Sequence, residues 1–114
     1  MESRPSRPSD RTQDLPTAQA LTLHDGDDVA VMTTDGTVGQ ICDIRAHDGE
    51  ILSLTLKSVA PFGHKIAVRS LPKDHVVTKY GQPIGIALTA IEAGSHVHTH
   101  NLSGYRSNLR GEEA

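Results

Sequence analysis

The sequence predicts one all-β domain made of short strands and hairpins. Its 114 residues fit a single globular domain. Turn signals built from Gly, Pro and Asp separate short apolar runs at intervals of roughly 8–13 residues, as in β sandwiches and barrels. No segment keeps an amphipathic helical period over three turns, which argues against a helical fold.

The strands are expected where apolar residues gather between turn signals. These segments are 21–24, 29–33, 37–44, 51–56, 65–70, 75–78, 84–89 and 95–101. In the fourth segment Leu52, Leu54 and Leu56 alternate with polar residues, so they are expected to face one side of a strand. Asp35 and Gly36 stand between two β-rich runs and predict a hairpin turn.

The two ends of the chain differ in composition from its middle. Residues 1–19 contain three prolines, three arginines and three serines but a single leucine, which predicts a disordered leader. The folded domain is expected over 20–102, and the polar segment 103–114 is expected to be a loosely held C-terminal tail.

Composition excludes several classes of function. A net charge of −3 without a basic stripe, and three aromatic residues in all, argue against nucleic-acid binding. No apolar run approaches the ~20 residues that span a bilayer. The one cysteine, Cys42, is expected to be a small buried hydrophobe, and without a signal peptide the predicted location is cytoplasmic. A thin aliphatic core hints that some apolar surface is buried against a partner.

Seven histidines are an unusual number for this length, and three of them are His96, His98 and His100. On a strand these positions share one face. Neutral imidazole is the commonest metal ligand in proteins, so this face is a candidate metal site whose missing ligands come from elsewhere, including another chain. A solvated histidine face is the alternative.

A second cluster, 61–67, places His64 and Lys65 at the start of a predicted strand. Gly63 before them is expected to let the backbone approach another group closely. Lys65 is expected to pair with a substrate carboxylate, or to act as a base if desolvation lowers its pKa. The alternative is an exposed lysine at a strand end.

A third cluster, 79–85, predicts a tight turn between strands because it holds two glycines and a proline. Lys79 and Tyr80 lie at its lip, where they could face a ligand. The alternative is a structural turn in which Tyr80 covers the core.

Taken in order, the segments 63–67, 79–85 and 94–101 closely resemble the N-terminal SAF domain of altronate and galactarate dehydratases. They are equally similar to the small subunit of sulfolactate sulfo-lyase. The resemblance covers about residues 20–102 and implies a β-clip fold, rich in hairpins. Members of this family eliminate water from sugar acids or sulfite from sulfolactate, and they also have a large domain or a separate large chain.

The resemblance implies the small subunit of a hydro-lyase that dehydrates an altronate-like sugar acid to a 2-keto-3-deoxy acid. Its partners would be a large catalytic subunit and a small carboxylated sugar or hydroxy acid, with a homo-oligomer left open. The alternatives are the small subunit of a sulfolactate sulfo-lyase and a non-catalytic module that binds sugar acids.

The resemblance also assigns roles to residues that match the family motifs. The implied catalytic residues are His98, His100 and Lys65. The implied substrate-binding residues are His64, Lys79, Tyr80 and Asn101. A divalent metal, Fe²⁺ or Mn²⁺, is expected in the complex with His98 and His100 as its ligands from this chain, whereas His96 lies outside the motif and is not expected to take part.

Overall fold

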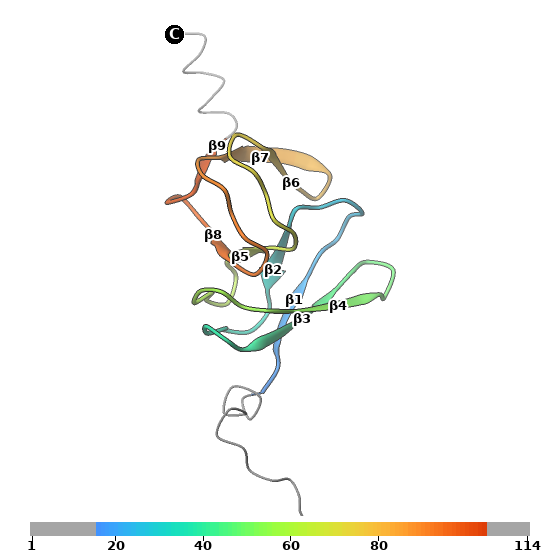
Figure 1. Cartoon of the computed structure of the whole chain (residues 1–114). Helices are drawn as coiled ribbons and strands as arrows, with labels where there is room; N and C mark the ends of the chain where they lie inside the picture. The colour runs from blue at the N-terminus through green and yellow to red at the C-terminus, as the bar shows by residue number, and fades with distance from the viewer. Residues whose placement is uncertain (1–15, 105–114) are drawn as a thin grey trace, which may run out of the picture.

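The structure is a computed structural model that describes residues 16–104, and it confirms the all-β class (Figure 1). The strands are β1 (Ala18–Leu21), β2 (Val29–Met32), β3 (Ile41–Arg45), β4 (Ile51–Thr55), β5 (Lys65–Ala67), β6 (Val76–Lys79), β7 (Gln82–Ala87), β8 (His96–Val97) and β9 (Leu102–Gly104). Between residues 16 and 104, no helix has the length and apolar character needed to cross a membrane.

The strands form two sheets. The larger sheet has the order β4-β3-β1-β2-β5-β8, and the smaller has the order β6-β7-β9. All neighbours are antiparallel except β1 and β3, which run parallel. The smaller sheet lies beside the β5–β8 end of the larger one, as Figure 1 shows.

Strands β2 and β5 lie between two hydrophobic cores. Successive side chains of a strand point to opposite faces, so Ala30 and Ile66 enter one core while Val29 and Ala67 enter the other. The first core contains Ala18, Ala20, Ala30, Met32, Cys42, Ile44, Leu56, Ala60 and Ile66. The second contains Val29, Ala67, Leu71, Val77, Ala87, Ile91 and Val97. The predicted burial of Cys42 is confirmed.

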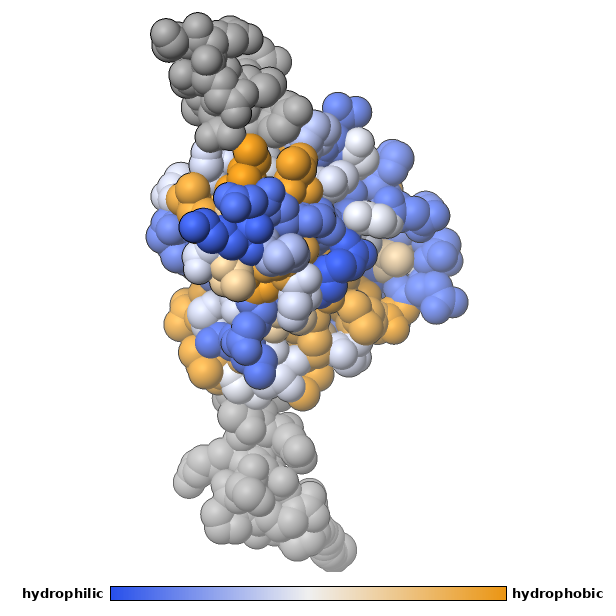
Figure 2. Space-filling view, turned by 45° about the horizontal axis from the view of Figure 1, so that its top comes forward, coloured by the Kyte–Doolittle hydropathy of each residue, from blue (hydrophilic) through white to orange (hydrophobic). Residues whose placement is uncertain are grey.

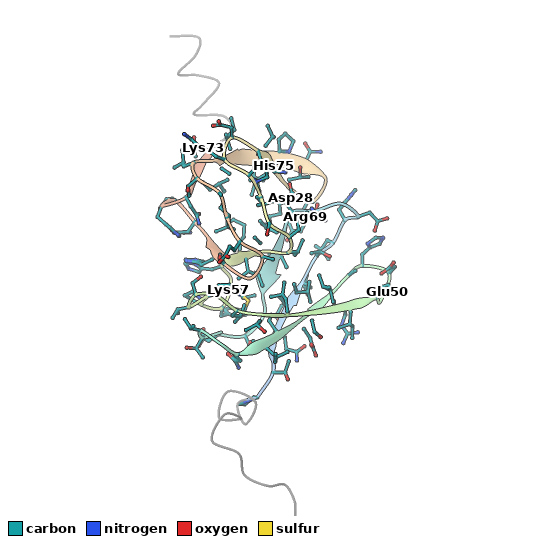
Figure 3. All side chains as sticks on the ribbon, viewed as in Figure 1. Asp28, Glu50, Lys57, Arg69, Lys73 and His75 are labelled. Carbon is teal, nitrogen blue, oxygen red and sulfur yellow. The ribbon has the colours of Figure 1, made fainter. Side chains whose placement is uncertain are left out.

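Buried carboxylates connect the start of β2 to the smaller sheet. Asp27 accepts the backbone N–H groups of Tyr80 and Gly81 at 2.9 and 3.0 Å in the β6–β7 turn. Asp28 accepts the N–H of Thr78 at 3.0 Å. Asp28 also pairs with the side chains of Arg69 and His75, which lie beside it in Figure 3. These contacts satisfy the buried carboxylates and fix the smaller sheet against β2.

The predicted hairpin at Asp35 and Gly36 is wrong. Instead of pairing with β2, β3 pairs with β1 and β4. Gly36 forms an isolated bridge with Ala60, with N···O distances of 2.8 and 3.0 Å in the two directions. A Cβ atom on Gly36 would meet side-chain atoms of Leu56 and Met32 at 2.4 and 2.8 Å, so the glycine serves a close packing contact.

Strand boundaries differ most from prediction at the ends of the domain. β1 begins at Ala18, inside the predicted leader 1–19, and ends at Leu21, where the segment 21–24 was expected to begin a strand. β9 continues to Gly104, inside the predicted tail 103–114. Residues 1–15 of the predicted leader and 105–114 of the predicted tail lie outside the described residues.

Several large apolar side chains lie at the surface. β4 is the edge strand of the larger sheet, and although Leu56 just after it is buried, Leu52 is 51% exposed, so the expected alternation holds only near the strand's end. Phe62 is 67% exposed, and both described cores are aliphatic as the composition predicts. In Figure 2 the apolar side chains lie in separate groups between polar ones.

Candidate functional site

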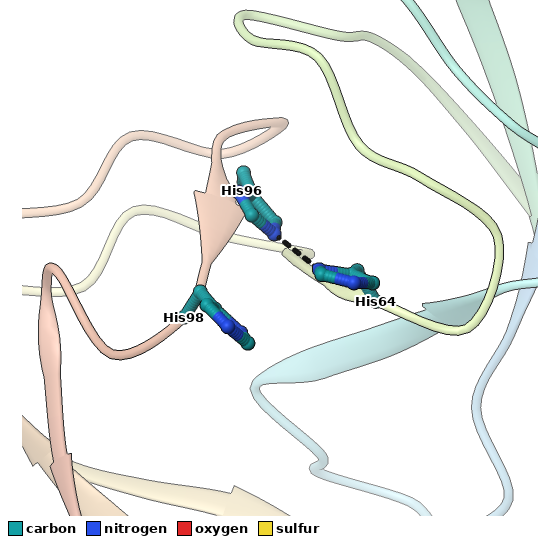
Figure 4. Close-up of side chains that lie close together, drawn as sticks. All are labelled: His64, His96 and His98. Carbon is teal, nitrogen blue, oxygen red and sulfur yellow. Dashed lines mark hydrogen bonds between the residues drawn. The ribbon is translucent and has the colours of Figure 1, made fainter.

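Three imidazoles meet where β5 begins and β8 ends, and we call them the histidine cluster (His64, His96 and His98; Figure 4). One ring nitrogen from each lies within 4.8 Å of those of the other two. Nδ1 of His64 lies 2.9 Å from Nε2 of His96, at hydrogen-bond distance. The rings of His96 and His98 stack with their centroids 5.4 Å apart.

The pairing of β5 with β8 explains why these side chains converge. The antiparallel register sets Ile66 opposite His96 and Lys65 opposite Val97. Continuing it by one residue sets His64 opposite His98. Opposite and diagonal neighbours across two strands are close enough for their side chains to touch.

Hydrogen bonds hold the backbone of the cluster from two sides. The carbonyl of His64 accepts the N–H of Met32 at 2.8 Å, and the N–H of His64 donates to the carbonyl of Pro61 at 3.0 Å. The N–H of His96 donates to Oγ of Ser58 at 2.8 Å. The cluster is therefore fixed by β2 on one side and by the loop after β4 on the other.

Asn101 holds the turn that follows β8. Its side chain is buried; Oδ1 accepts the N–H of His98 and Nδ2 donates to the carbonyl of His96, both at 2.9 Å. The expected strand over 95–101 is present only as β8, because the chain leaves the strand after Val97 and turns through residues 98–101. Asn101 positions the histidines, and its contact with substrate stays a prediction.

The cluster lies in an electropositive environment. Burial lowers the pKa of His96, and the neighbouring His64, His98, His100 and Lys65 lower it further. Burial, together with the charge of Lys79, also lowers the pKa of Lys65. The desolvation that a basic Lys65 requires is therefore present in the structure.

The other residues predicted for the site surround this cluster or lie farther from it. His100 is exposed, and although its ring centroid lies 5.6 Å from that of His96, it is not among the three converging imidazoles. Nζ of Lys79 lies 4.5 Å from the ring centroid of Tyr80. Tyr80 is 43% exposed and adopts a φ of 57°, so it belongs to the surface of the β6–β7 turn.

One observation adds a residue to the expected site, and another corrects the expectation for Gly63. His96 lies within the cluster although the family motif gave no reason to include it; its i, i+2 spacing from His98 was the available signal. Gly63 has a φ of +84° with no atom within 4 Å of an added Cβ, so it supplies a left-handed turn and not the expected close approach.

A hollow of about 310 Å³ lies elsewhere on the molecule, between the β1–β2 connection and the β3–β4 turn. Its walls include His24, Asp27, Ile44, Leu52 and Arg69. No residue of the histidine cluster lines this hollow, so the hollow and the histidine cluster are separate sites.

Comparisons with known proteins agree with the motif resemblance. Residues 18–105 match the altronate/galactarate dehydratase SAF domain. The (2R)-sulfolactate sulfo-lyase subunit alpha of Chromohalobacter salexigens is 38% identical over 87 residues, which cover 74% of this chain and 93% of that protein.

Two Escherichia coli enzymes match over a similar part of this chain. Altronate dehydratase is 40% identical over 91 residues, and galactarate dehydratase (L-threo-forming) is 36% identical over 85 residues. These alignments cover 80% and 75% of this chain but only 17% and 15% of the two dehydratases. The chain belongs to the altronate/galactarate dehydratase SAF domain family.

Proposed function

We propose that this chain is the small subunit of a hydro-lyase that dehydrates an altronate-like sugar acid to a 2-keto-3-deoxy acid. The observation that carries the proposal is the histidine cluster beside Lys65, in a family whose relatives include dehydratases and a sulfo-lyase. The match spans 17% of altronate dehydratase but 93% of a protein named as a subunit alpha, which supports a site shared with a large subunit.

Elimination of water from a hydroxy acid requires a proton acceptor and a group that stabilises negative charge. A base removes the proton from the carbon next to the carboxylate, and the electron pair that remains forms a C=C bond to the following carbon. Hydroxide leaves that following carbon and takes up a proton to become water. The resulting enol becomes the 2-keto acid. A divalent metal would supply charge stabilisation for the developing enolate when bound.

Residues of this chain would divide these tasks. His98, His100 and Lys65 are the proposed catalytic residues, because neutral imidazole and a desolvated amine both accept protons. His64, Lys79 and Tyr80 would bind the substrate, the cationic Lys79 by attracting its carboxylate.

A sulfolactate sulfo-lyase subunit is the second candidate. The 38% identity along 93% of a sulfo-lyase subunit alpha favours it. The elimination would follow the same course, with sulfite in place of hydroxide as the leaving group, and it would also produce a 2-keto acid.

The test begins with affinity capture of the full chain from its source cells and identification of the proteins that accompany it. We expect a large chain similar to the part of altronate dehydratase that this chain does not match. The purified pair is then supplied with altronate, galactarate and sulfolactate, and the release of 2-keto acid and of sulfite is measured. Water elimination supports the first candidate, and sulfite release supports the second.

The proposal fails if no such large chain is captured, even after mild cross-linking, and the chain alone binds hydroxy acids tightly in calorimetry without converting them. That result would indicate a non-catalytic module that binds sugar acids.

A further inference from the structure

We propose that the histidine cluster itself is a metal site, in which His64, His96 and His98 hold one divalent first-row transition metal ion. The inference deepens the proposed function, because it assigns the ligands and the class of ion to the same site. It differs from the pair expected from the sequence, since His64 and His96 take part and His100 does not. His64 and His98 would then act as ligands of the ion, which leaves His100 and Lys65 as the proton-accepting groups of the proposed function.

The spacing of the ring nitrogens fits one ion after a small movement. Two nitrogens that bind the same ion at ~2.0–2.1 Å can be no more than ~4.2 Å apart. Nδ1 of His64 and Nε2 of His96 already satisfy this limit at 2.9 Å. The full spread of the three donors is 4.8 Å, so a side chain must close in slightly, and His98 is exposed and free of the core.

The donor set selects the class of ion. All three groups are imidazoles, which suit Zn²⁺, Fe²⁺, Ni²⁺ and Cu²⁺, whereas Mg²⁺, Ca²⁺ and Mn²⁺ prefer oxygen ligands. Of the two ions that the family resemblance implies, Fe²⁺ therefore fits these donors better than Mn²⁺.

The backbone around the three ligands is organised before any ion binds. Asn101 ties His96 to His98, Ser58 holds the N–H of His96, and Met32 holds the carbonyl of His64. These bonds are made to the backbone of the ligands, so they fix where the imidazoles start, and their loss should weaken metal binding.

Three protein ligands leave coordination positions open, as in catalytic metal sites. His98 is exposed, while His64 and His96 are only partly buried, so the open side of the cluster is accessible. The neighbouring Lys65 favours an anionic ligand there. A hydroxy acid, which offers a carboxylate and a hydroxyl oxygen, is the class of ligand that fits.

The test uses the full chain, freed of metal with a chelator and titrated with Co²⁺ while its visible absorption is recorded. We expect about one ion per chain. Replacing His64, His96 or His98 by Ala should lower the affinity at least about tenfold. His47→Ala removes an exposed histidine elsewhere and His100→Ala removes the excluded neighbour, and both should bind as the unchanged chain does.

A second measurement needs no substitution. In ring ¹H–¹⁵N spectra of the full chain, Zn²⁺ should shift the signals of His64, His96 and His98 together. The proposal is overturned if the folded chain binds no ion, or if binding survives His96→Ala and His98→Ala but is lost in His100→Ala. Either result would leave the small-subunit proposal intact, because that proposal is tested by capture of the large chain and by elimination with the unsubstituted complex, and neither measures metal binding by this chain alone.

Discussion

Nδ1 of His64 lies 2.9 Å from Nε2 of His96, although the two residues are 32 positions apart in the sequence. The contact exists because β5 and β8 are neighbours in the larger sheet. Any change that disturbs this pair of strands, or the turn after β8, should therefore also disturb the histidine cluster.

Asn101→Ala tests the turn after β8. The substitution leaves the N–H of His98 and the carbonyl of His96 without their partner, which should cost about 1–3 kcal/mol of unfolding free energy. It should also weaken metal binding, because His96 and His98 lose the bonds that fix their backbone. Urea denaturation and the Co²⁺ titration measure the two effects, and Thr99→Ala, at an exposed position in the same turn, is the control. Unchanged metal affinity in a folded Asn101→Ala chain would contradict the positioning role.

Gly94→Ala tests the approach of the loop before β8 to the edge of β4. A Cβ atom on Gly94 would lie 2.3 Å from the carbonyl oxygen of Thr55, so the loop must move away from the strand. Gly49→Ala is a matched control, because Gly49 has nearly the same φ, +92° against +90°, but has no atom within 4 Å of an added Cβ.

Both glycine variants should lose the ~1 kcal/mol expected for a positive φ, and Gly94→Ala should lose clearly more. Thermal denaturation measures the difference. Equal losses in the two variants would show that the close contact does not matter for stability.

Asp28→Ala tests the connection between β2 and the smaller sheet. It removes the acceptor for the N–H of Thr78 and the partner of Arg69 and His75. We expect a loss of about 1–3 kcal/mol in unfolding free energy, since a buried donor is left unpaired. Asp25→Ala, at a side chain that is 86% exposed, should change stability by less than about 0.5 kcal/mol. Similar values for both would mean that the buried carboxylate is not a structural link.

Cys42 should make the stability depend on pH in the alkaline range. Burial, and then the charge of Asp43, raise the pKa of this thiol to about 11 from 9.0. The unfolded chain therefore loses this proton first as the pH rises, so unfolding free energy should fall between about pH 9 and about pH 11. Below about pH 9 the thiol is protonated in both the folded and the unfolded chain. In the folded chain the buried thiol should therefore resist alkylation.

Urea denaturation across this pH range, compared with Cys42→Ala, isolates the contribution of the thiol from those of Tyr and Lys. The variant should show a shallower loss of stability. The same pH dependence in both chains would contradict the raised pKa.

Local sequence patterns located most strands but not their pairing. The apolar runs that became β2 and β4 were visible because alternation and turn residues act over a few positions. The parallel pair of β1 with β3 was not visible, because it joins segments separated by a whole strand and leaves the expected hairpin at Asp35 unformed. This pairing buries Ala18, Ala20, Cys42 and Ile44 together in the first core.

The site shows the same division between local and long-range information. Motif resemblance pointed to His98, His64 and Lys65, which do lie near one another. The inclusion of His96 depends on the β5–β8 register, and the exclusion of His100 depends on the turn that Asn101 closes. Spacing on an idealised strand placed His96, His98 and His100 on one face, so it indicated His96 but could not show that His64 joins the cluster or that His100 does not.

The most direct test of the central claim is the elimination activity of the purified two-chain complex carrying His98→Ala or His100→Ala, with His47→Ala as the control. The substitutions lie at exposed positions, so co-purification should show that the complex still assembles. A chain that contributes its histidines to a shared active site predicts loss of 2-keto acid formation in the His98 and His100 variants and full activity in the control. Full activity in both of those variants, with the complex intact, would contradict a catalytic role for this chain.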